Sequence, residues 1–181
     1  MYQTATRQSR LLTTSSFLKQ SLLCSFGIIF LAFAAHLIIP LQPVPLTFQS
    51  SAAIFLGMIM GPRLAAITLI GYFAAGLVGF PVFAAGAQFG PTMGYLIGFL
   101  PGALISGWLA ENGMAKTILQ SFIASIIGTV AIFACGLSVL AHFVGWHQSI
   151  MLGLLPFIIT EPLKLLAISL VAPHFWKNPI Q

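Results

Sequence analysis

The stretch FIITEPLKLLAISL, residues 157–170, is almost continuously apolar, yet it contains Glu161 and Lys164 three positions apart. It belongs to a longer apolar run, residues 149–172. A helix that crosses the hydrocarbon core of a bilayer needs about 20 apolar residues, so this run is long enough. A charged side chain near the middle of such a helix costs about 2.5–3.5 kcal/mol on insertion scales. The stretch therefore predicts a membrane helix that keeps two charges for a structural or functional reason.

The composition of the whole chain also favours lipid as the solvent. Hydrophobic residues make up 59% of the 181 residues and charged residues only 5%, whereas a soluble domain carries roughly 25% charged residues. A formal charge of +5 would suggest nucleic acid as the partner of a soluble protein. Here six of the seven basic residues lie in expected loops or chain ends, so they indicate membrane orientation instead.

Six apolar runs follow one another, at residues 21–39, 46–60, 64–78, 93–110, 117–141 and 149–172. The second and third runs are short, and Gly61, Pro62 and Arg63 between them predict a tight turn between antiparallel neighbours. Short spans need burial among longer helices or local thinning of the bilayer. The sequence thus predicts an all-α integral membrane protein with six transmembrane helices.

The basic residues give these helices an orientation. Those outside the last run are Arg7, Arg10, Lys19, Arg63, Lys116 and Lys177. All of them lie on one side of the membrane if every run crosses it, and the positive-inside rule then puts both termini in the cytoplasm. We expect a polar cytoplasmic segment over 1–20, a six-helix domain over 21–172 and a cytoplasmic tail over 173–181, in a bacterial cytoplasmic membrane.

A cleaved signal peptide is the alternative for the N-terminus. Residues 1–34 contain basic residues, an apolar stretch and an Ala-x-Ala site at Ala32 and Ala34. However, the apolar run continues through residue 39, and cleavage would leave five spans with disturbed charge sidedness. We therefore expect this segment to form the first helix.

Small residues recur every four positions in the fourth run, at Gly98, Gly102, Ser106 and Ala110. Such a strip lets two helix backbones approach closely in a membrane. Packing within the chain is the interpretation that we favour, and a docking surface for another membrane subunit is the alternative. Ser21 and Ser25 in the first run form a weaker example of the same four-residue spacing.

Two connections on the expected outer side are uncharged and rich in proline, glycine or aromatic residues. They are PLQPVPLTFQ, residues 40–49, and the segment 79–92. Irregular backbone at membrane depth is tolerated where it is buried in protein or lines a cavity. These connections are either tight links between packed helices or, as we prefer, the lid and wall of a small-molecule cavity.

Glu161 and Lys164 share a helix face, so they can neutralise each other as a buried ion pair. Pro162 lacks an amide proton and biases Glu161 away from helical angles, and Pro156 acts similarly earlier in the run. We therefore expect the helix to be kinked or opened beside the pair. Interrupted helices with polar groups at mid-depth form ligand sites in transporters. The ligand implied is a small carboxylate that also carries N–H groups.

The sequence offers little for catalysis. It contains no HExxH or GxSxG motif, no paired aspartates and no phosphate-binding loop of the GxxxxGK[ST] type. The four histidines are scattered near the ends of the runs, and Cys24 and Cys135 lie apart within apolar runs. We therefore expect no enzyme, no metal site and no cofactor.

The chain resembles the BioY family, the biotin-binding S components of energy-coupling-factor (ECF) transporters. The residues that carry the resemblance are PVPLTFQ (43–49), Gly57, Gly61-Pro62-Arg63, Tyr72, Gly76, GFPVF (79–83), GPTMGYLIGF (90–99), and Glu161 with Lys164. The resemblance implies a six-helix protein that captures biotin from the outer side, beneath the connections 40–49 and 79–92.

The resemblance also implies roles for residues. Lys164 would hold the valerate carboxylate of biotin, and Glu161 would accept hydrogen bonds from the N–H groups of its ureido ring. The other ligand-binding residues that it implies are Thr47, Gln49, Phe83, Gln88 and Tyr95. The implied partners are a coupling membrane subunit and two cytoplasmic ATPase subunits.

Two alternatives stay open. The family usually has aspartate where this chain has Glu161, which leaves another small carboxylate or a vitamin precursor as a possible ligand. A non-transport membrane scaffold with a structural Glu–Lys pair is the second alternative.

Overall fold

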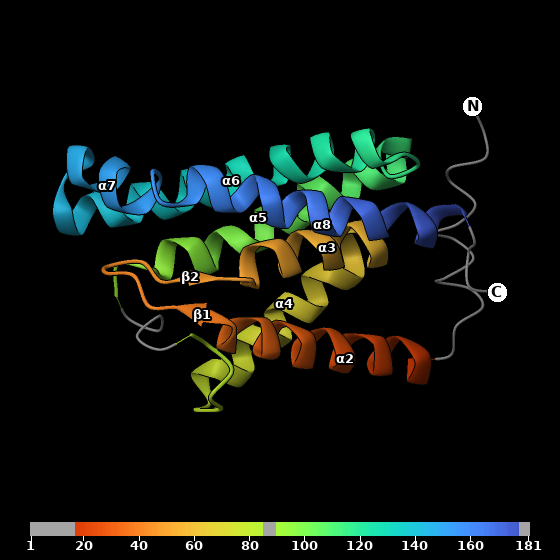
Figure 1. Cartoon of the computed structure of the whole chain (residues 1–181). Helices are drawn as coiled ribbons and strands as arrows, with labels where there is room; N and C mark the ends of the chain where they lie inside the picture. The colour runs from red at the N-terminus through yellow and green to blue at the C-terminus, as the bar shows by residue number, and fades with distance from the viewer. Residues whose placement is uncertain (1–16, 85–89, 178–181) are drawn as a thin grey trace.

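The computed structural model describes residues 17–84 and 90–177 (Figure 1). Within these residues the chain forms helices and one two-stranded ribbon. The elements are α2 (Phe17–His36), β1 (Ile38–Ile39), β2 (Leu46–Thr47), α3 (Gln49–Met60), α4 (Pro62–Leu77), α5 (Met93–Leu109), the π-helical turn η1 (Ala110–Met114), α6 (Ile118–Val144), α7 (Trp146–Gly153) and α8 (Phe157–Lys177). The predicted N-terminal segment and Gln88 fall largely or wholly outside the described residues.

Four of the described helices are long and apolar enough to cross a membrane. They are α2, α5 with η1, α6 and α8. The apolar helices α3 and α4 are shorter, with 12 and 16 residues. The turn predicted between them is present at Gly61, whose φ of 81° favours glycine, and Pro62 occupies the first turn of α4.

The helices pack so that α5 has neighbours on several sides. Figure 1 shows α2 along one side of the bundle, α6 and α8 along the other, α3 and α5 between them, and α4 slanting from the middle of the bundle across α2. This arrangement leaves many apolar side chains of α2 exposed, as expected for a helix that faces lipid.

The small-residue strip of α5 packs inside the chain. A Cβ atom on Gly98 would lie 2.8 Å from the backbone oxygen of Ile132 in α6, and one on Gly102 would lie 2.9 Å from that of Gly128. Ser106, further along the strip, is fully buried. The prediction of packing within the chain is therefore confirmed.

The last apolar run is interrupted, as its two prolines predicted. Helix α7 ends at Gly153 and α8 begins at Phe157, so the break precedes the charged pair by more than a turn. Pro156 lies in that break, where a missing amide proton costs little. Helix α8 continues through Pro162, so the helix is not opened directly beside Glu161.

The connection 40–49 is a compact hairpin rather than an extended loop. Strands β1 and β2 pair antiparallel, with Ile38 opposite Thr47 and Ile39 opposite Leu46. Val44 and Leu46 are buried, which anchors the hairpin on the bundle. Because α3 starts directly after β2, the hairpin fixes where Thr47 and the first turn of α3 lie.

Candidate functional site

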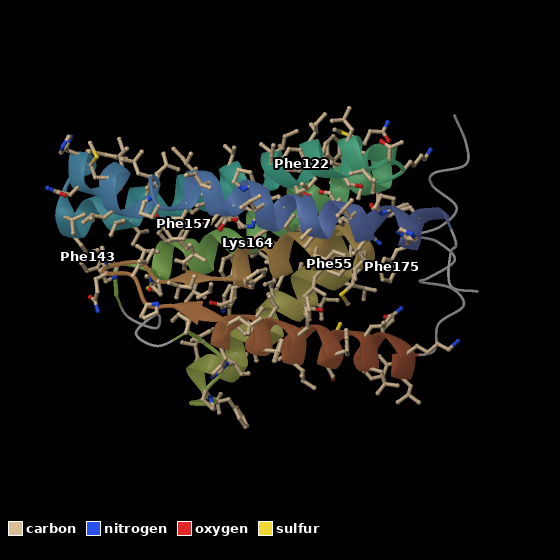
Figure 2. All side chains as sticks on the ribbon, viewed as in Figure 1. Phe55, Phe122, Phe143, Phe157, Lys164 and Phe175 are labelled. Atoms are coloured by element: carbon tan, nitrogen blue, oxygen red, sulfur yellow. The ribbon has the colours of Figure 1, made fainter. Side chains whose placement is uncertain are left out.

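Glu161 and Lys164 form a buried ion pair in α8, each about 5% exposed. Figure 2 shows Lys164 about midway along the bundle, between Phe143 near one end and Phe175 toward the other. The pair therefore lies in the interior of the bundle, although α8 itself begins only at Phe157, shortly before Glu161. In such a place, each charge depends on the other and on nearby dipoles.

The Lys164 ammonium uses all three of its protons. Nζ donates to Oε1 of Glu161, to the backbone oxygen of Thr47 at 2.8 Å and to Oγ of Ser50 at 3.2 Å. The ring of Phe48 lies on another side, with its centroid 5.7 Å from Nζ, within the range of a cation–π contact. The hairpin and the start of α3 thus hold the cation from across the bundle.

Ser50 links the two charges. Its Oγ lies 3.0 Å from Oε1 and 3.2 Å from Oε2 of Glu161, and it also accepts from Lys164. A serine hydroxyl can donate one proton while accepting another. Ser50 was not predicted from the sequence, and the indication available was its place just after the PVPLTFQ segment.

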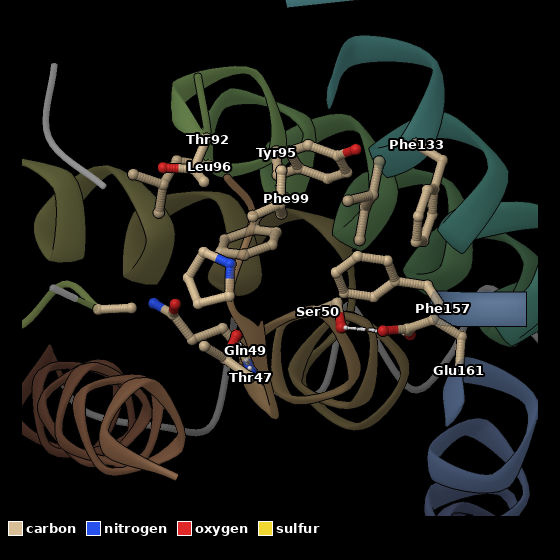
Figure 3. A pocket seen from close by; sticks show the side chains of 14 residues that line it. Thr47, Gln49, Ser50, Thr92, Tyr95, Leu96, Phe99, Phe133, Phe157 and Glu161 are labelled. Carbon is tan, nitrogen blue, oxygen red and sulfur yellow. Dashed lines mark hydrogen bonds between the residues drawn. The ribbon is translucent and has the colours of Figure 1, made fainter. Parts of the chain in front are cut away.

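A cavity lies beside this pair and encloses about 50 Å³. Glu161 and Ser50 contribute to its wall, as do Thr47 and Gln49 from the neighbouring hairpin and α3. Figure 3 shows Glu161 on one side of the cavity and Gln49 with Thr92 on the other. Lys164 is not among the residues that line the cavity, so its charge reaches this space through Glu161 and Ser50.

Aromatic side chains form another wall of the cavity. The ring of Tyr95 packs edge-on against Phe133, with centroids 5.6 Å apart, and Phe133 packs in the same way against Phe157. The Tyr95 hydroxyl donates to the backbone oxygen of Gly153 at 2.9 Å, which ties α5 to the end of α7. Tyr95 therefore offers its ring, rather than a free hydroxyl, to a ligand.

Thr92 brings an uncommitted hydroxyl to the cavity. It lies at the start of α5, it is 7% exposed, and its Oγ1 has no hydrogen-bond partner in the described part of the chain. A buried polar group normally has a partner. Thr92 is thus a residue that the sequence analysis did not single out and that the tertiary structure brings to the site.

The predicted site residues are only partly brought together. Thr47, Gln49, Tyr95 and Glu161 line the cavity, and Lys164 is bonded to its wall. Phe83 lies outside the lining and packs edge-on against Tyr72, with centroids 5.1 Å apart. Gln88 lies outside the described residues.

The site has the chemistry of binding rather than of bond breaking. Among residues 17–84 and 90–177 there is no group of three or more histidine, cysteine or carboxylate side chains placed to hold a metal ion. The cavity offers aromatic surface, neutral hydrogen-bonding groups and the carboxylate of Glu161. A small, largely apolar ligand with a few polar atoms would fit such a wall. These features define a helical membrane protein that binds a small molecule.

Comparison with known proteins identifies the family. The BioY family profile matches residues 5–180, and the chain belongs to the BioY family. It is 32% identical over 149 residues to the probable biotin transporter BioY of Pyrococcus horikoshii, covering 80% of this chain and 88% of the relative. It is 34% identical over 154 residues to the biotin transporter BioY of Thermotoga maritima, covering 81% and 89%.

The fold is similar to a solved structure as well. The crystal structure of the S component for biotin from an ECF-type ABC transporter superposes with a TM-score of 0.75 at 20% identity. The match covers 91% of this chain and 96% of that chain. At this identity the likeness establishes the fold, and the family membership comes from the sequence matches.

Proposed function

We propose that this chain takes up biotin across a membrane as the substrate-capturing S component of an ECF transporter. Its family, the relatives named biotin transporters and the S-component fold support this function. The protein is a transporter and not an enzyme. The observation that carries the proposal is the buried Glu161–Lys164 pair beside an aromatic-walled cavity, because it combines the charge and the apolar surface that a vitamin acid requires.

The orientation that we propose has six crossing helices and both termini in the cytoplasm of a bacterium. The arrangement of basic residues supports it. Lys19 lies near the start of α2, Arg63 in the first turn of α4 and Lys116 between η1 and α6. These positions share one side of the membrane if every helix crosses it, and the positive-inside rule assigns that side to the cytoplasm. At 1.5 Å per residue, α3 and α4 extend about 18 and 24 Å, shorter than the roughly 30 Å hydrocarbon core. The flanking hairpin of β1 and β2 would complete the crossing from the outer side.

The binding mode that we propose uses the two charges differently. Lys164 has three acceptors already, so a ligand carboxylate would replace the neutral Thr47 oxygen or Ser50 hydroxyl. A carboxylate is the stronger acceptor for an ammonium. Glu161 would keep its contact with Lys164 and accept an N–H group of the ureido ring on the cavity side.

The cavity has to widen when the ligand enters. A volume of about 50 Å³ accommodates a few water molecules, and a bicyclic acid is much larger. The break between α7 and α8 and the hairpin 38–47 border this region, so small displacements of these segments would enlarge it. We propose that binding and widening occur together.

The partners that we propose are a coupling membrane subunit and two cytoplasmic ATPase subunits. The S-component fold supports such an assembly. The chain has no phosphate-binding loop of the GxxxxGK[ST] type, so ATP hydrolysis by that route would have to come from another subunit.

The test is retention of radiolabelled biotin by the purified full-length protein in detergent. Wild-type protein should retain biotin, and Lys164→Ala should not. Lys116→Ala is the matched control, because Lys116 is exposed and lies on another loop. Retention by Lys164→Ala at wild-type affinity would refute the site assignment.

Competition identifies the ligand class in the same assay. Desthiobiotin retains the ureido ring and the carboxylate, whereas pimelate retains only carboxylates. Displacement of biotin by desthiobiotin but not by pimelate supports recognition of both the ureido ring and the carboxylate. Stronger binding of pimelate than of biotin would favour a vitamin precursor as the substrate.

A further inference from the structure

Tyr72 lies outside the cavity wall but is bonded to it. Its side chain, from α4, is fully buried, and its hydroxyl lies 2.7 Å from the backbone oxygen of Val82. A carbonyl oxygen cannot donate, so the single tyrosine proton must point to Val82. The hydroxyl oxygen is then left as an acceptor.

That acceptor determines how the Gln49 amide is turned. Gln49 Nε2 is hydrogen-bonded to the Tyr72 hydroxyl. If the amide were rotated by half a turn, its oxygen would face the tyrosine oxygen with no proton between them. The two bonds of Tyr72 therefore hold Gln49 with its nitrogen toward α4.

The oxygen of the Gln49 amide is consequently available as a hydrogen-bond acceptor. Gln49 lines the cavity and is 3% exposed, and no donor in the described part of the chain is bonded to its Oε1. Figure 3 shows Gln49 across the cavity from Glu161. An amide oxygen can accept a hydrogen bond from an N–H group of a ligand in the cavity that Gln49 lines.

We infer that Tyr72 is a positioning residue for ligand recognition: it fixes the Gln49 amide so that its oxygen accepts an N–H group of the bound ligand. This inference rests on the proposed function for the identity of the ligand. With Glu161 on the opposite side, a cyclic urea with two N–H groups would meet an acceptor on each side. A ligand without N–H groups would leave the Gln49 oxygen unpaired.

Tyr72→Phe is a selective test because it removes only the hydroxyl. The ring contacts with Phe83 and Phe73, at centroid distances of 5.1 and 5.9 Å, do not need it. Freed from Tyr72, the Gln49 amide can rotate and lose its bond to the ligand. We expect biotin affinity to fall about three- to tenfold, the range for one neutral hydrogen bond.

A double-mutant cycle separates positioning from general damage to the fold. In a Gln49→Ala background, Tyr72→Phe should change biotin affinity less than about twofold, because the group on which it acts is gone. Tyr95→Phe is the matched control: it removes another buried hydroxyl bonded to a backbone oxygen, and its effect should be equal in both backgrounds. Equal effects of Tyr72→Phe in both backgrounds would overturn the inference.

A measurement without ligand keeps this result distinct from failure of the proposed function. In protein with 15N-labelled glutamine, Gln49→Ala identifies the side-chain amide resonances of Gln49. Tyr72→Phe should shift these resonances and speed their exchange with water. If wild-type protein retains no biotin, the proposed function fails, but the amide measurement still decides whether Tyr72 holds Gln49; unchanged resonances overturn the inference.

Discussion

Replacing Lys164 with methionine would separate the structural from the ligand-binding role of the buried pair. Methionine preserves much of the side-chain length and removes the charge. Glu161, 5% exposed, would keep the Ser50 hydroxyl as a donor but lose its counter-ion. Breaking a buried pair in this way costs about 3–5 kcal/mol. For a chain of this size that corresponds to a decrease in Tm of about 6–20 °C.

The double variant Lys164→Met/Glu161→Gln gives the comparison. It removes both charges and leaves a neutral side chain that can still accept from Ser50. Exchange of a buried ion pair for neutral residues is often close to neutral in stability. We therefore expect its Tm to return to within about 4 °C of wild type, a difference of about 1 kcal/mol.

Thermal unfolding in detergent, followed by circular dichroism, measures stability, and retained radiolabelled biotin measures binding. The double variant should be stable and fail to bind, whereas wild type is stable and binds. Normal binding by the double variant would show that the pair is only structural and that other residues bind the ligand. An unchanged Tm in Lys164→Met would refute the reasoning on buried charge.

Three further substitutions test individual contacts. Ser50→Ala should lower stability by about 1.5–3 kcal/mol, measured as a change in Tm, because a hydroxyl bonded to two charged groups is lost. Thr92→Val should leave Tm unchanged or raised, since Oγ1 has no partner in the described structure; a clear decrease would contradict this. Gly102→Ala should destabilise by about 1–3 kcal/mol, because its Cβ would meet the backbone of α6 at 2.9 Å. Gly71→Ala is its control, since the nearest atom there is the flexible end of Ile28 at 3.0 Å.

The site also explains how two charges are kept in the interior of a membrane protein. Lys164, Glu161 and Ser50 are hydrogen-bonded to one another, so both charges of the pair have partners within the chain. The Thr92 hydroxyl, by contrast, has no hydrogen-bond partner in the described structure. A ligand would thus compete with the existing partners of the charged groups, and it would supply a hydrogen-bond partner to the neutral hydroxyl of Thr92.

The sequence was sufficient for the features that depend on composition and local spacing. Low charge and long apolar runs identify a membrane protein because lipid cannot solvate charges or open backbone. The i, i+3 spacing of Glu161 and Lys164 places the two side chains on one helix face, which is how the ion pair forms. The strip from Gly98 to Ser106 predicted close helix packing for the same kind of local reason.

Only the tertiary structure decided which distant segments meet the pair. The break in the last apolar run lies at Pro156, whereas α8 continues through Pro162, and the local preferences of the two prolines do not say which one interrupts the helix. Ser50 contacts Glu161 across 111 positions of sequence, and Tyr72 holds Gln49 across 23. Such contacts depend on how whole helices are placed, whereas apolar periodicity and charge spacing depend only on neighbours along the chain.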